Sequence, residues 1–74
     1  MNIGELAATG AQLFQDVGIK GGRLDAEIIL AEVLEKDKSW IIAHNEVEPS
    51  SAQIERIQSL FEIRAKRHPM SYVL

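Results

Sequence analysis

The first third of the chain carries apolar and small side chains at the three- and four-residue spacing of one helical face. Its members are Ile3, Leu6, Ala7, Gly10, Leu13, Phe14 and Val17. Asn2 followed three residues later by Glu5 is a capping-box signal, and Gly18 suits the left-handed residue that closes a helix. The pattern predicts a helix over residues 3–17.

The next segment is apolar on nearly every side, and the helix that it predicts covers Leu24 to Glu35. Such a helix needs neighbours on at least two sides. Asp25 and Glu32 lie seven residues apart, and we expect them to share one narrow solvent-facing stripe. This helix is therefore expected at the centre of the fold, with Leu30 buried.

The second half of the chain predicts a brief helix through residues 40–43, capped by Ser39 or Asp37, and a longer helix after Ser50. Ser50 and Gln53 repeat the capping-box spacing, and Pro69 marks the end. The inward stripe of the longer helix comprises Ile54, Ile57, Leu60, Phe61 and Ala65. We predict an all-α fold, a small bundle of four to five short helices.

The tail from Pro69 to Leu74 fits either a last helical turn or the start of a strand. Because the sequence stops inside this apolar run, we expect a cut near a domain boundary. The 74 residues suit one domain, 1–74.

The net charge of -3 disfavours direct nucleic-acid binding, for which a basic excess is typical. The chain has no cysteine, no apolar run long enough for a membrane span and no basic leader before an apolar segment. We therefore expect a cytoplasmic monomer that does not bind membranes.

Candidate catalytic and metal-binding residues are few. His44 and His68 lie at predicted helix ends, where a cation interacts favourably with the helix dipole, and they lack the spacing of a helical metal site. Asp25 and Glu27 point about 200° apart around a helix, so they do not converge. The turn 18–22 lacks the spacing of a phosphate-binding loop. No catalytic, cofactor or metal residue is predicted.

One basic cluster stands out, comprising Arg64, Lys66, Arg67 and His68. Such a cluster complements the dipole at the carboxyl end of a helix, and it also suits docking of an acidic partner surface. Both readings stay open at the level of sequence.

Three segments occur in the order seen in one protein family: RLDAEIIL at 23–30, SWIIAH at 39–44 and RAKRHPMSYVL at 64–74. In this respect the chain resembles the N-terminal domain of the release-factor glutamine methyltransferases, the HemK/PrmC family. Glu35 and Arg67 stand where glycine is frequent in that family, which leaves the local turn geometry open.

The resemblance implies a five-helix bundle joined through a β-hairpin to a Rossmann-like methyltransferase domain. That larger domain would use S-adenosylmethionine to methylate the side-chain amide of a glutamine, within the Gly-Gly-Gln tripeptide of class I peptide-chain release factors. Its cofactor loop and its Asn-Pro-Pro-Tyr motif have no counterpart in this sequence. The small domain would help to hold the release factor, with Arg64, Arg67 and Tyr72 as candidate contacts.

Two alternatives belong to other functional classes. One is a free-standing helical module for protein–protein interaction, with no link to catalysis. The other is a helix-turn-helix DNA-binding protein, which the acidic residues of the central helix disfavour.

Overall fold

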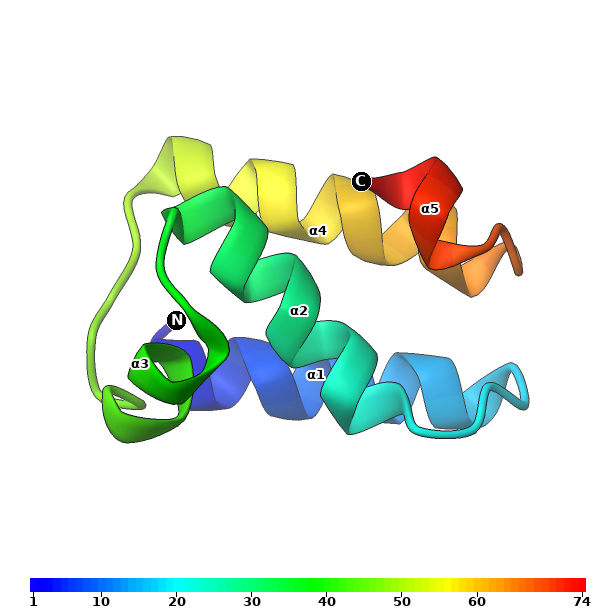
Figure 1. Ribbon diagram of the computed structural model, residues 1–74, viewed down its shortest axis with the longest axis horizontal. Coiled ribbons are helices and arrows are strands. Elements are labelled where there is room, and N and C mark those ends of the chain that lie inside the picture. Colours follow the sequence, from blue (N-terminus) through cyan, green and yellow to red (C-terminus); the bar gives the residue numbers. More distant parts are fainter.

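The computed structural model describes residues 1–74 as five helices and no strands, as the sequence predicts. These are α1 (Ile3–Asp16), α2 (Gly22–Leu34), α3 (Lys38–Ala43), α4 (Ser51–Ala65) and α5 (Met70–Val73). In Figure 1, α1 and α4 run along opposite long edges, and α2 crosses between them. Helix α2 contacts α1, α3 and α4, so its predicted central place is confirmed. No helix is both long and apolar enough to cross a membrane.

The two predicted capping boxes are both formed. At the start of α1, the Asn2 side chain accepts from the Glu5 N–H at 2.8 Å, and the Glu5 carboxylate accepts from the Asn2 N–H at 2.8 Å. Ser50 and Gln53 make the same pair of bonds at 3.2 and 2.9 Å before α4. Of the two candidate caps for α3, Asp37 is the one used. These helix starts follow from residues within one turn of each other.

Helix α2 begins at Gly22, two residues earlier than predicted, directly after the left-handed Gly21. Gly22 lies against α1, where an added Cβ would stand 2.8 Å from the Cβ of Phe14. Because such an approach leaves no room for a side chain, glycine allows the first turn of α2 to pack on α1.

Two phenylalanine rings form the middle of the core. Phe14 of α1 and Phe61 of α4 meet edge to face, with ring centroids 5.5 Å apart and an angle of 81° between their planes. Leu30 of α2 is fully buried, as predicted, while Ile28 and Val33 are half-buried. The other buried apolar residues are Ile3, Leu6, Ala7, Ile19, Ala26, Ile29, Ile41, Ile57, Leu60 and Val73.

Glu35 and Arg67 both adopt the left-handed backbone conformation, with φ of 55° and 71°. Each follows a long helix, where glycine is the usual residue at such an angle. The turn geometry typical of glycine is therefore kept at both positions, although each carries a side chain. A left-handed non-glycine residue is strained unless its surroundings hold it.

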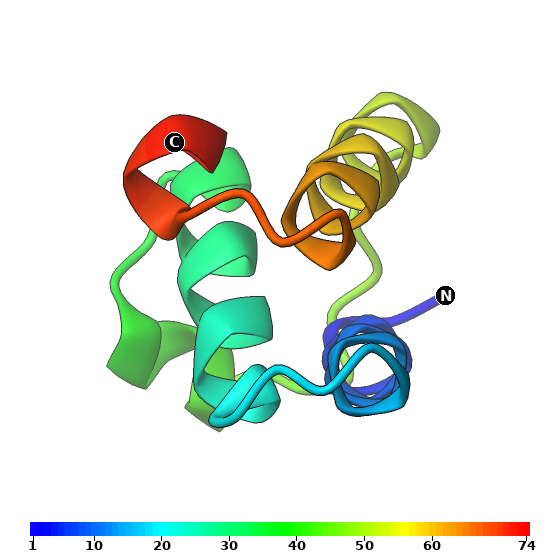
Figure 2. The same cartoon turned by 90° about the vertical axis from the view of Figure 1, so that its right-hand side faces the viewer.

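Of the two alternatives that the sequence leaves open for the tail, the structure forms the helical turn. Pro69 is extended and precedes α5, and Val73 packs into the core with 7% of its surface exposed. Figure 1 shows α5 at the carboxyl end of α4, and in Figure 2 it lies on the side opposite the amino terminus.

The only tryptophan, Trp40, lies at the edge of the bundle rather than in its centre. Its ring is half-buried and stacks on His44, with centroids 4.1 Å apart and planes 13° from parallel. The Lys36 ammonium lies 5.1 Å from the centre of the tryptophan ring. This packing of Lys36, Trp40 and His44 connects α3 to the end of α2.

Candidate functional site

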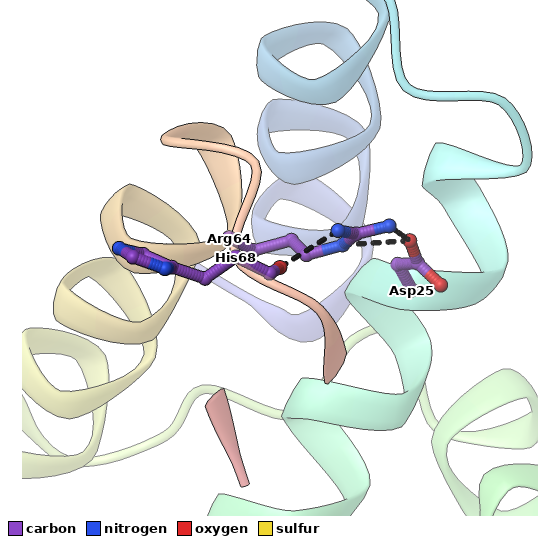
Figure 3. A network of polar contacts seen from close by, with 3 residues as sticks. All are labelled: Asp25, Arg64 and His68. Atoms are coloured by element: carbon purple, nitrogen blue, oxygen red, sulfur yellow. Dashed lines mark hydrogen bonds and ion pairs between the residues drawn. The ribbon is translucent and has the colours of Figure 1, made fainter. Parts of the chain in front are cut away.

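Arg64 of α4 reaches across to α2 and pairs with Asp25 (Figure 3). Its Nε and Nη2 donate to one Asp25 oxygen at 3.2 and 3.1 Å, and its Nη1 donates to the His68 carbonyl at 2.8 Å. The two side chains are 18% and 15% exposed. The expectation that Asp25 faces solvent is therefore wrong: Arg64 covers it, and only Glu32 of that stripe is exposed.

Arg67 lies beyond the end of α4 and is exposed. Its Nη1 donates to the Val17 carbonyl at 2.7 Å, which ties this turn to the end of α1. Arg67 lines a shallow hollow together with Arg64 and the turn after α1; we call it the basic hollow, and it comprises Gly18, Ile19, Lys20, Arg64 and Arg67. Neither Lys20 nor Arg67 forms an ion pair with a carboxylate.

Tyr72 is the third residue that the resemblance proposes, and 66% of its surface is exposed. Its ring stacks on that of His68 at 4.4 Å, with the planes 25° apart. The structure thus brings Arg64 and Arg67 to one hollow, whereas Tyr72 stands on α5 and does not line it. An exposed tyrosine on a short helix is suited to contact with another protein.

Lys20 is a residue that sequence reasoning missed. It lies in the glycine-rich turn 18–22, which the sequence pattern accounts for as a connection between two helices. Its place beside Arg67 depends on how α1 and α4 pack, which helical spacing does not show. The one local signal is a lysine between glycines, in a turn that exposes it.

Comparison with known proteins gives a match to the family model described as the PrmC N-terminal domain, over residues 5–74. The chain belongs to this family. The resemblance carried by the three sequence segments is thereby confirmed.

Among curated proteins, this PrmC N-terminal domain is 31% identical over 65 residues to a bifunctional methyltransferase of Rickettsia bellii, a match covering 88% of the chain and 12% of the relative. It is 35% identical over 52 residues to the release factor glutamine methyltransferase of Xylella fastidiosa, covering 70% of the chain and 19% of the relative. The chain thus spans less than a fifth of the length of these relatives. No solved structure matches it.

Several other charged residues of the PrmC N-terminal domain have local partners. Glu27 pairs with Arg23 at 3.3 Å, so the Asp25 and Glu27 carboxylates of α2 bind different arginines. The Trp40 N–H and then the Ser39 hydroxyl donate to Asp37, and these bonds lower the pKa of its carboxyl group. His44 Nδ1 lies 2.8 Å from the Trp40 carbonyl at the end of α3. No three histidine or carboxylate groups gather as a metal site would require.

Proposed function

We propose that this PrmC N-terminal domain is the substrate-docking domain of a release factor glutamine methyltransferase. It holds a class I release factor while a separate domain methylates the glutamine amide of the Gly-Gly-Gln tripeptide, with S-adenosylmethionine as methyl donor. The observation that carries the proposal is the family match over residues 5–74, supported by a relative named for this activity. Cofactor and catalytic residues are assigned to the other domain of the parent enzyme.

A docking domain suits the chemistry of this reaction. An amide nitrogen is a poor nucleophile, so the rate depends on holding it in line with the methyl group. Contacts far from the reacting atoms supply binding energy for that positioning when the substrate is a large protein. A small bundle with a closed apolar core offers a rigid support for such contacts.

The proposed contacts follow from how each candidate side chain is placed. Arg67 and Tyr72 are exposed and meet a partner directly. Arg64 is mostly covered and bound to Asp25, so it holds the carboxyl end of α4 in place beside them.

The test uses the methyltransferase that contains this domain, with and without residues 1–74. Intact release factor and a short Gly-Gly-Gln peptide serve as substrates, and kcat/KM is measured for each. Removal of a docking domain lowers kcat/KM on the intact protein on the order of tenfold or more, and leaves the peptide nearly unaffected. An equal loss on both substrates, or no loss on either, contradicts the proposal.

Two binding measurements on the isolated chain complete the test. Calorimetric titration with a release factor is expected to give saturable heat. Titration with micromolar S-adenosylmethionine is expected to give none, because the methyl donor is assigned to the other domain. A free-standing interaction module would bind neither of the two.

A further inference from the structure

The basic hollow is a local exception on an acidic molecule. The chain has 11 carboxylate side chains against eight lysines and arginines, yet three of these cations, Lys20, Arg64 and Arg67, line the same hollow. Asp25 neutralises Arg64, and no carboxylate pairs with the other two. Two of the three cations that line the hollow are therefore not neutralised by a carboxylate.

The arrangement of Arg67 is fixed before any ligand arrives. Its backbone is left-handed, and the bond from Nη1 to the Val17 carbonyl holds the side chain against the turn after α1. This bond leaves Nε and Nη2 with no acceptor inside the molecule. Arg64, which lines the same hollow, is held by Asp25 and the His68 carbonyl. Preformed donors lose less conformational freedom on binding.

A fork of guanidinium N–H groups beside an ammonium group matches a carboxylate, and it also matches a phosphate. Proteins that bind nucleic acids neutralise many phosphates, commonly about 6–10. The two unpaired cations of the basic hollow, on a chain of net charge -3, do not provide that footprint. The charge balance therefore favours one or two carboxylates of an acidic protein segment.

We propose that the basic hollow binds an acidic segment of the partner protein, with Arg67 and Lys20 as the residues that contact its carboxylates. Arg64 is the positioning residue. This proposal rests on the proposed docking function, and it specifies the chemistry of one part of the contact.

The first arm of the test titrates the ¹⁵N-labelled chain with tetraglutamate and, separately, with tetraglutamine. Tetraglutamate is expected to shift the amide signals of residues 18–20 and 67, and tetraglutamine is not. Raising the salt from about 0.02 M to about 0.5 M should abolish the shifts because it screens the charges. Shifts scattered over the surface, or equal shifts with both peptides, would overturn the proposal.

Two variants remove the contacting charges. Arg67→Gly suits the left-handed backbone, so it removes the guanidinium without adding strain. Lys20→Gln changes an exposed side chain that forms no ion pair. Each should weaken tetraglutamate binding about three- to fivefold, the upper part of the range of a single exposed ion pair. The matched control is Lys38→Gln on α3, at the far end of the molecule in Figure 1, which should change binding less than twofold.

The second arm repeats the titrations with intact release factor and with a short oligouridylate. If release factor binds and both hollow variants weaken it, the hollow and the docking function are both supported. If it binds equally well to wild type and variants, the hollow proposal fails and docking stands. If tetraglutamate binds in the hollow but release factor does not bind, the docking function fails. Tighter binding of oligouridylate than of tetraglutamate would overturn the choice of an acidic protein segment.

Discussion

Gly10 of α1 lies where side chains from α2 and α4 meet that helix. A Cβ added at Gly10 would stand 2.7 and 2.8 Å from two atoms of the Phe61 ring and 3.0 Å from the Cβ of Ala26. Two effects of Gly10→Ala then oppose each other. Alanine is the better helix former by about 1 kcal/mol, whereas overpacking a tight core costs about 1–3 kcal/mol.

The structure indicates that overpacking is the larger effect. Phe61 is 2% exposed and its ring is held edge to face against Phe14, so it cannot swing into solvent. With the overpacking cost in the upper part of its range, about 2–3 kcal/mol, and the helix gain of about 1 kcal/mol subtracted, we expect Gly10→Ala to destabilise the chain by about 1–2 kcal/mol. For a domain of this size, that lowers the melting temperature by roughly 4–16 °C.

Thermal unfolding followed by far-ultraviolet circular dichroism measures this change. Ala8→Gly, at an exposed position on the same helix, measures the propensity effect alone and should cost about 1 kcal/mol. Combining Gly10→Ala with Phe61→Leu should give a smaller loss than the sum of the two single changes, because the smaller side chain makes room. A rise in melting temperature for Gly10→Ala would refute the reasoning.

Four further outcomes are expected. Leu30→Ala should lower the free energy of unfolding in urea by about 2–5 kcal/mol, and a loss below 1 kcal/mol would show that α2 is not enclosed. Asp25→Asn leaves the Arg64 guanidinium without its partner and should cost about 1–3 kcal/mol in the same assay; adding Arg64→Met should recover part of this loss. Glu35→Gly relieves a left-handed backbone and should raise stability by about 0.5–1 kcal/mol; a fall in melting temperature would count against strain there. Hydrogen bonds to Asp37 lower the pKa of its carboxyl group in the folded state. The stability that this carboxylate contributes is therefore complete above the ordinary pKa of 3.8 and is lost as the pH falls through the lowered pKa. Melting temperatures measured against pH should lose this dependence in Asp37→Asn.

Local signals in the sequence predicted much of the fold correctly. Both capping boxes and the left-handed Gly18 depend on residues within one helical turn, so spacing alone identified them. The burial of Leu30 followed from the apolar residues on nearly every side of its helix. These predictions hold because helix ends and apolar faces are determined by near neighbours.

The features that the sequence did not predict depend on contacts between segments far apart in the chain. Asp25 was expected in solvent because its partner, Arg64, lies 39 residues later in the chain. The early start of α2 at Gly22 depends on contact with Phe14 of another helix. For the candidate site, Arg67 could be selected as one of a basic cluster. Its nearness to Lys20 needed the packing of α1 against α4.

The contacts of Trp40 with His44 and Lys36 determine what the fluorescence of this protein reports. As the sole indole lies on α3 at the rim, its emission follows the separation of that short helix from α2. Circular dichroism instead averages over every helical turn. If the two signals change at the same temperature, the six-residue α3 unfolds together with the core. If the emission changes at a lower temperature, α3 separates from α2 while the remaining helices stay folded.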